Sequence, residues 1–382
     1  MGLYRYLLAL AVVIGHSAPI DGLPLIGGGL AVKLFFIVSG FYMGLILTEK
    51  YQPIEGGLRL FFSNRFLRIF PIFWLVFGIE LIAAIGFHRF STGGDPRLAL
   101  NGDLIRSGHY GTFGTLLVSQ VSLLGTELPN LFSWNPQSGF SWHNTMETGG
   151  EWMRGWKFLL MPHSWTLSCE LFFYSLVPLL NRLSTRWLVA IVLGNIAVAV
   201  LLPRGIDPAL AEVAKDYFAP LQLGFFASGL LAYRIYARHW DWLEKGPAGT
   251  SLIVVLLVVT VGFNQLSHLS HRLTLWGLFA IGSLALPVLF ARTRTIKWDR
   301  RIGDLSYPLY LVHAVVILTL HRLVPSQCLG FEDFFQSPAF PLLAILFSTA
   351  LAWLLETTLD RKLDQFRQRR VQRQQASLSS GS

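Results

Sequence analysis

Residues 4–16 read YRYLLALAVVIGH, an apolar run that carries Arg5 near its start and His16 at its end. Eleven residues return an α-helix to within about 20° of the same face, after a rise of about 16 Å. One face of the predicted helix therefore presents both side chains, at different depths. Ionisable groups inside a membrane span are costly and mark functional sites. The alternatives are snorkelling of Arg5 to lipid phosphate and a packed, neutral imidazole at His16.

The composition around this run is that of a membrane protein. Apolar residues make up 53% of the 382-residue chain and charged residues 14%, against about 25% charged residues in soluble domains. Apolar windows of about twenty residues recur without the alternation of a transmembrane barrel. We therefore predict an all-α, polytopic transmembrane bundle of about ten spans, at about 3–20, 30–48, 66–86, 165–181, 187–202, 218–236, 250–266, 273–291, 305–323 and 339–357.

The net charge of +9 is concentrated in short loops and in the tail RKLDQFRQRRVQR. Lys and Arg are enriched in cytoplasmic loops, so both termini are expected in the cytoplasm. This distribution favours anionic lipid headgroups over nucleic acid as the partner of the basic residues.

The predicted membrane domain covers residues 1–360, and the tail 361–382 is expected to be basic and then disordered. One long extracytoplasmic loop, 87–164, contains a predicted re-entrant or interfacial helix near 113–125. If that helix crossed the membrane, the topology of everything before it would be inverted. The Trp-rich block 133–156 suits either a sugar-binding loop or an interfacial aromatic belt. Cys169 and Cys328 indicate neither a disulfide framework nor a metal site.

Two further spans carry polar stripes. In HSWTLSCELFFY, His163 and Glu170 are seven residues apart and Tyr174 follows one turn later. In LSYPLYLVH, the stripe consists of Ser306, Tyr310 and His313.

The segment FFSNRFLRIFP places Arg65 and Arg68 on one face at the entry of the third span. Paired guanidinium groups there suit a phosphate-bearing molecule, and positive-inside anchoring is the alternative. No two histidines show the i, i+4 spacing of a metal-binding helix, so no metal site is predicted.

Taken together, RYLLALAVVIGH, KLFFIVSGF, RFLRIFP, HSWTLSCELFFY and LSYPLYLVH occur in an order and spacing that resembles the membrane acyltransferase-3 family, the O-acetyltransferases of surface polysaccharides. The resemblance spans roughly 5–357. It implies a ten-helix enzyme of the bacterial cytoplasmic (inner) membrane that acylates a sugar hydroxyl. Acetyl-CoA, or another acyl-CoA, is implied as a co-substrate and no cofactor as permanently bound. The implied partners are acyl-CoA, a carbohydrate acceptor that is free or lipid-linked, and the bilayer. Oligomeric state is not predicted.

The resemblance also assigns roles to residues of this chain. His16 matches the family's essential histidine and Arg5 its paired arginine, while Arg65 and Arg68 match its basic pair near the donor's entry. The Trp–Glu–Tyr motif is matched by Trp165, Glu170 and Tyr174. The late SYxxYLxH pattern is matched by Ser306, Tyr307, Tyr310 and His313, and Glu356 roughly matches an acid at the end of the last span. Lys33 departs from the family pattern, because an Asp is common there.

Acyl transfer to a hydroxyl needs a base and a group that stabilises the oxyanion. We expect His16 to be the base, or else to carry the acyl group as an acyl-imidazole, with Glu170 or another buried acid orienting it. Arg5, Arg65 and Arg68, with Ser306 and Tyr307, are expected at the donor. Trp165, Tyr174, Tyr310, His313 and His163 are expected to bind or support the acceptor. The alternatives are a transporter or flippase for lipid-linked sugars, and a sensor or scaffold.

Overall fold

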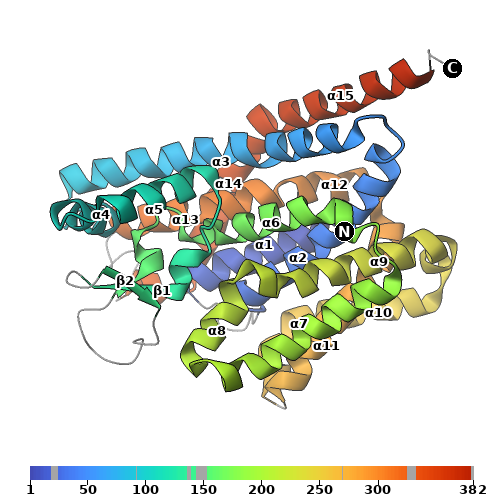
Figure 1. Cartoon of the computed structure of the whole chain (residues 1–382), viewed down its shortest axis with the longest axis horizontal. Coiled ribbons are helices and arrows are strands. Elements are labelled where there is room, and N and C mark those ends of the chain that lie inside the picture. Colours follow the sequence, from blue (N-terminus) through green and yellow to red (C-terminus); the bar gives the residue numbers. More distant parts are fainter. Residues whose placement is uncertain are drawn as a thin grey trace. The chain divides into compact units, whose positions relative to one another are not determined.

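The protein is described by a computed structural model covering residues 1–18, 25–91, 93–135, 139–142, 153–268, 270–324 and 333–379. Helices dominate it (Figure 1). The chain forms two compact units, each described by itself. The first comprises Met1–Ile72, Val177–Val189 and Phe225–Ser382, and the second Phe73–Leu176 and Ala190–Gly224. Cys328 lies outside the described residues.

Every predicted span coincides with an observed helix, and this confirms the all-α, polytopic fold. The helices are α1 (Gly2–His16), α2 (Gly28–Ile46), α3 (Gly57–Phe90), α6 (Trp165–Leu180), α7 (Thr185–Gly205), α9 (Ala219–Lys245), α10 (Pro247–Ser267), α11 (His271–Thr293), α13 (Ser306–Leu323) and α14 (Ala339–Leu355). Within the described ranges, six helical segments are long and apolar enough to cross a membrane. Two further apolar helices, Gly2–His16 and Pro247–Phe263, are shorter. The number of ten crossings stays a prediction.

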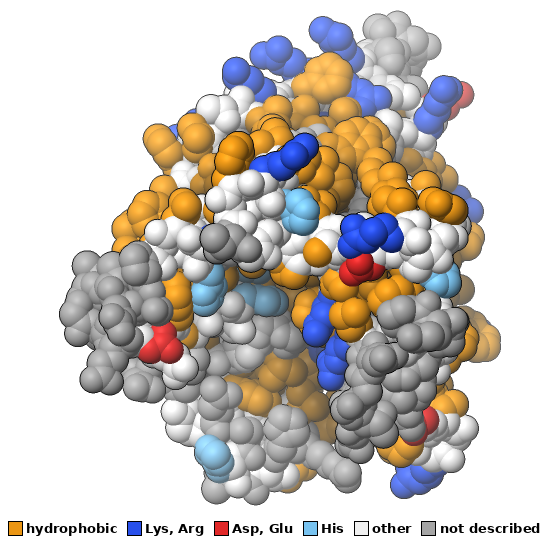
Figure 2. Space-filling model, turned by 90° about the vertical axis from the view of Figure 1, so that its left-hand side faces the viewer, with side chains coloured by type: hydrophobic (Ala, Val, Ile, Leu, Met, Phe, Trp, Pro, Cys, Tyr) orange, Lys and Arg blue, Asp and Glu red, His pale blue; other side chains and the backbone are white. Residues whose placement is uncertain are grey.

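Many apolar side chains are exposed on the surface, as expected for a protein that contacts lipid. In α7, only 6% of the most apolar window is buried, and Trp187, Leu193 and Leu201 are exposed. Figure 2 shows hydrophobic side chains over much of the face in view, with Lys and Arg gathered toward its upper end. Lipid tails are as apolar as these side chains, so their exposure carries no penalty in a bilayer.

Helix α1 lies at the centre of the first unit and contacts α2, α12 (Lys297–Asp304), α13 and α14. Its N-terminus is capped by Asp299, whose Oδ2 accepts from the Gly2 amide at 2.8 Å and Oδ1 from the Leu3 amide at 2.8 Å. A carboxylate there satisfies amides that have no partner within the helix and favours the positive end of the helix dipole. The cap fixes α1 along its axis.

Helices α2 and α9 approach each other closely at two glycines. A Cβ on Gly229 would lie 2.0 Å from the Ile37 carbonyl oxygen, and one on Gly40 would lie 2.1 Å from that of Phe226. Small residues permit such backbone contact between membrane helices.

We expect Gly229→Ala to lower the free energy of unfolding by about 2 kcal/mol, because backbone atoms cannot move aside as a side chain can. Thermal unfolding in detergent measures the change. Gly277→Ala is the matched control, since a Cβ on this α11 glycine meets nothing within 4 Å. Equal melting temperatures for the two variants would contradict the close packing.

Where the first unit is described, two π-helical segments interrupt it, η1 (Leu47–Tyr51) and η6 (Glu356–Asp360). A π-turn adds a residue and rotates the next helical turn about the axis, and such turns are frequent at functional sites. Beyond η6, helix α15 runs from Arg361 to Ser379. The predicted disorder at the end of this tail stays a prediction, and residues 380–382 lie outside the described part of the chain. The helix is anchored to the rest of the first unit by two side chains. Its Arg370 donates to Asn64 Oδ1 at 2.8 Å, and its Gln374 donates to the Glu55 carbonyl at 2.8 Å.

The second unit contains the predicted extracytoplasmic loop. In the loop, the structure has the helices α4 (Pro96–Arg106), α5 (Tyr110–Ser122) and η2 (Leu128–Leu131). Outside the loop, the same unit contains α8 (Pro208–Tyr217). Short strands, which the sequence did not predict, form an antiparallel sheet of order β2 (Gly139–Trp142), β1 (Phe132–Asn135), β3 (Met153–Arg154). The predicted re-entrant or interfacial segment is helical in α5, whose 13 residues span only about 20 Å. Part of the Trp-rich block, 136–138 and 143–152, lies outside the described residues.

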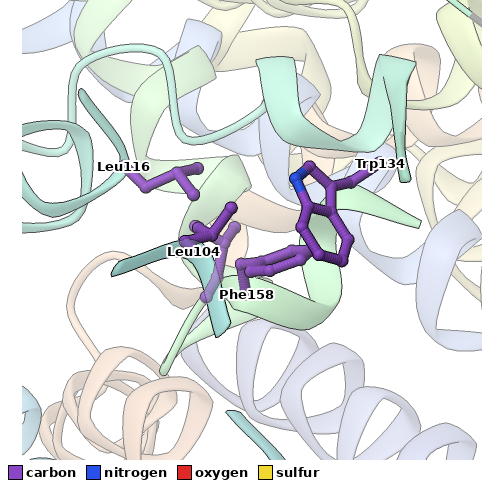
Figure 3. Close-up of a cluster of buried hydrophobic side chains, with 5 residues drawn as sticks. Leu104, Leu116, Trp134 and Phe158 are labelled. Carbon is purple, nitrogen blue, oxygen red and sulfur yellow. The ribbon is translucent and has the colours of Figure 1, made fainter. Parts of the chain in front are cut away.

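A small apolar core holds this region together. Leu104 of α4, Leu116 of α5, Trp134 of β1 and Phe158 of η3 (Gly155–Phe158) pack around one centre (Figure 3). The rings of Trp134 and Phe158 meet edge to face, with centroids 5.3 Å apart. Trp134 therefore serves packing, not sugar contact, in this structure.

Candidate active site

The structure brings together two histidines that the sequence placed in separate motifs. His16 ends α1, and His313 lies in the middle of α13, which packs against α1. Their ring centroids are 5.0 Å apart, with an interplanar angle of 53°. His313 is fully buried, whereas His16 is exposed. The pair therefore joins a reachable imidazole to one fixed in the core.

Backbone contacts set the proton positions on both rings. His16 Nδ1 lies 2.9 Å from the Val12 carbonyl oxygen, and His313 Nδ1 lies 2.6 Å from that of Tyr310. A carbonyl only accepts, so each Nδ1 carries the proton in a neutral ring. The lone pair of His16 is then on Nε2, the atom that a general base needs.

Arg5 lies on the same helix, about 16 Å from His16 along the axis. Its guanidinium carbon is 5.6 Å from the centroid of the Tyr42 ring, and the group interacts electrostatically with Asp304. The ring of Tyr42 on α2 lies beside this guanidinium, which favours a positioned side chain over one that reaches out to lipid. Arg5 and His16 cannot act on the same atom.

Arg68 is held by three contacts. Its Nη1 donates to both oxygens of Asp360, at 2.9 and 2.7 Å, and its guanidinium carbon lies 5.3 Å from the centroid of the Tyr307 ring. Tyr307 in turn donates to the Ile69 carbonyl at 2.8 Å. The predicted donor residues Arg68 and Tyr307 therefore form one assembly with Asp360, which the sequence interpretation missed.

The other residues predicted at the donor have different surroundings. Ser306 is buried and donates to the Gly303 carbonyl at 2.7 Å, so its hydroxyl joins α13 to α12. Arg65 has its guanidinium carbon 5.9 Å from the centroid of the Phe61 ring. Glu356 is paired with Arg361 at 2.9 Å.

The Trp–Glu–Tyr motif lies on α6, within the second unit. Tyr174 donates a hydrogen bond to Glu170 Oε1, which confirms that the two residues share a face. The rings of Trp165 and Tyr217 meet edge to face at 4.8 Å. His163, in η4 (Pro162–Ser164), is buried, and its carbonyl accepts from Thr166 at 3.2 Å.

Among the described residues, no group of three or more His, Cys, Asp and Glu side chains is placed to hold a metal ion. Cys169 is a buried free thiol. The chemistry at hand is therefore that of imidazole, guanidinium, carboxylate and phenol groups.

Comparison with known proteins identifies the family to which this site belongs. The family model described as an acyltransferase domain, acyltransferase-3, matches residues 2–357. The exopolysaccharide production protein ExoZ of Rhizobium meliloti (strain 1021) is 25% identical over 371 residues, which cover 95% of this chain and 98% of ExoZ. The acyltransferase MdmB of Streptomyces mycarofaciens is 24% identical over 78% of this chain and 71% of MdmB.

A third relative is longer than this chain. The peptidoglycan O-acetyltransferase OatA of Listeria monocytogenes is 24% identical over 76% of this chain, which corresponds to 45% of OatA. No solved structure matches. The family model covers nearly the whole chain. Because two of these relatives are named as acyltransferases, the comparison supports acyl transfer and not the transporter or scaffold alternatives. The chain belongs to the acyltransferase-3 family and is an integral membrane acyltransferase.

Proposed function

We propose that the protein transfers an acetyl group from acetyl-CoA to a sugar hydroxyl of a surface polysaccharide, an exopolysaccharide or its lipid-linked precursor. The likeness to ExoZ over nearly the full length of both chains supports a polysaccharide acceptor. The name of OatA, an O-acetyltransferase, supports acetyl as the group transferred and oxygen as its acceptor.

The observation that carries the proposal is the geometry of His16. Its ring is exposed, its Nδ1 is committed to the Val12 carbonyl, and His313 lies beside it. Nε2 takes the proton of the sugar hydroxyl as the oxygen attacks the thioester carbonyl. The carbon–sulfur bond then breaks, and the imidazolium returns the proton to the departing CoA thiolate. The ring emerges unchanged, and no covalent acyl-histidine is required.

Donor binding is proposed for the basic side chains near the start of α1 and α3. Acyl-CoA is elongated, so its nucleotide can lie against Arg65 and Arg68 and its pantetheine arm can pass Arg5 toward His16. Ser306 and Tyr307 support this face through their hydrogen bonds to backbone carbonyls. The basic loops beside these residues favour a cytoplasmic location for the donor-binding residues and for both termini. The membrane is then the bacterial inner membrane.

Glu170, which accepts from Tyr174, is the third residue proposed for catalysis. Trp165, Tyr174, Tyr310, His313 and His163 are proposed to bind or support the acceptor. Aromatic rings suit the apolar faces of sugars, and Trp165 carries such a ring.

Removal of the protein from its host tests the proposal. We expect surface or secreted polysaccharide to lose O-acetyl groups at one hydroxyl position, which NMR of the purified polysaccharide identifies. A plasmid with the wild-type chain should restore these signals, and one with His16→Gln should not. Unchanged acetyl content in the deletion strain would contradict the proposed acceptor class.

A further inference from the structure

The basic tail helix α15 is fixed against the start of α3, beside which it runs in Figure 1. Arg370 donates to Asn64 Oδ1 at 2.8 Å and to Ser63 Oγ at 2.9 Å. Asn64 is fully buried and itself donates to the Tyr51 hydroxyl at 3.0 Å. These contacts give α15 one defined orientation on α3, so its other side chains face α3 reproducibly.

This orientation places a third arginine with the two predicted at the donor. Arg367 of α15 interacts electrostatically with both Arg65 and Arg68. Together with Arg370 these residues form what we call the arginine cluster: Arg65, Arg68, Arg367 and Arg370. Asp360 pairs with Arg68 and Asp364 pairs with Arg367. Asp304 also interacts electrostatically with Arg68. Four guanidinium groups therefore face three carboxylates, and one positive charge is left over.

Arg367 carries a buried hydrogen-bond donor that lacks an acceptor among the described residues. It is 6% exposed, and its Nη2 donates to Asp364 Oδ1 at 2.7 Å. Its Nη1 is buried and donates to no acceptor within the described residues. A buried charged donor without an acceptor is unfavourable, and nearby like charges add to the cost. An anion with several oxygens removes both penalties.

The cluster can be reached from solvent. The side chain of Asp364, beside Arg367, is 46% exposed, and that of Arg68 is 20% exposed. Phosphate oxygens match the fork of a guanidinium group, which donates two parallel hydrogen bonds to them. Phosphate esters are therefore the ligand class that fits the geometry and the charge.

We propose that α15 completes a phosphate-binding site at the start of α3, in which Arg367 acts together with Arg65. Under the proposed function, on which this identification of the ligand rests, the phosphates are those of the nucleotide of acyl-CoA. The headgroup of an anionic phospholipid presents the same chemistry and is the other source. In either case the tail helix is part of the binding machinery and not a solvated appendage.

Binding of adenosine 3′,5′-bisphosphate, the nucleotide portion of CoA, tests the site without turnover. The protein is held in nanodiscs of zwitterionic phosphatidylcholine, and binding is measured by isothermal titration calorimetry. We expect Arg367→Gln to weaken binding about tenfold, the loss of one charge-assisted hydrogen-bonding group. Arg369→Gln is the matched control, because it removes the same charge from an exposed position of the same helix. It should change the affinity less than about twofold, as expected for a screened surface charge.

A second arm identifies a lipid as the source. If the site holds a phospholipid, the wild type does not bind the nucleotide, and phosphatidylglycerol in the nanodisc raises its melting temperature. Arg367→Gln should lose that rise, and Arg369→Gln should keep it. The proposal is overturned if Arg367→Gln behaves as Arg369→Gln does in both arms.

Arg367→Lys guards against loss of fold as an explanation, because it keeps the charge and should retain part of the binding that Arg367→Gln loses. Acetyl transfer by the wild type separates this proposal from the proposed function. Acetyl transfer, together with equal nucleotide binding and equal stabilisation by phosphatidylglycerol in the wild type and Arg367→Gln, would refute the site alone. Phosphate binding that depends on Arg367, without acetyl transfer, would refute the function alone.

Discussion

His16→Ala is expected to lower the rate of acetyl transfer by at least about 100-fold, the usual contribution of a general base. Without the imidazole, no group at the end of α1 removes the proton of the acceptor hydroxyl. The rate is measured with purified protein in detergent, as release of CoA thiol in the presence of acceptor. His16→Gln should lose as much, because an amide keeps hydrogen-bonding capacity but does not take up a proton at neutral pH.

The matched control is His268→Ala, which removes another exposed histidine at the end of a helix, α10. It should leave the rate unchanged. Melting temperatures of His16→Ala and the wild type should agree closely, since an exposed side chain contributes little to the free energy of unfolding. Wild-type turnover by folded His16→Ala protein would rule out His16 as the base.

Asp360→Ala is expected to lower the free energy of unfolding by about 3 kcal/mol. Asp360 is 3% exposed and takes both its hydrogen bonds from Arg68. Its removal leaves the Arg68 guanidinium partly buried without its counter-charge. Thermal or denaturant unfolding in detergent measures the loss.

The double variant Arg68→Ala/Asp360→Ala should recover part of this stability, because neither charge is then left alone. Asp103→Ala is the control: it breaks an exposed ion pair with Arg106, and such pairs contribute little. An equally small effect of Asp360→Ala would mean that Arg68 is held in place by the Tyr307 ring and not by its ion pair.

Apolar runs were sufficient to predict the long apolar helices, because the length and composition of a span are local properties of the chain. The faces were predictable for the same reason, as the bond from Tyr174 to Glu170 on α6 confirms. Helical periodicity does not reveal which side chain of a stripe meets which distant partner. On α13, Ser306 bonds the Gly303 carbonyl while His313 lies beside His16.

Asp360 escaped prediction for a more specific reason. It lies at the end of η6, where the π-turn shifts the helical register, so a count of 3.6 residues per turn does not place it opposite Arg68. Glu356, one turn earlier, was the acid that the sequence offered. The contacts of α15 could not be predicted either, because its hydrogen bonds go to Ser63, Asn64 and the Glu55 carbonyl, which are far away in the sequence. The composition of the tail gives its charge but does not identify the distant residues that it contacts.

Acyl transfer from a CoA thioester to a carbohydrate hydroxyl can be observed with the purified wild-type protein alone, in detergent and without a second compartment. The protein is incubated with acetyl-CoA labelled in the acetyl group and with de-O-acetylated host polysaccharide. We expect label to appear in the polysaccharide as an alkali-labile ester, in an amount equal to the CoA thiol released above hydrolysis. Intact protein that leaves the polysaccharide unlabelled while acetyl-CoA is present would contradict acetyl transfer to this acceptor.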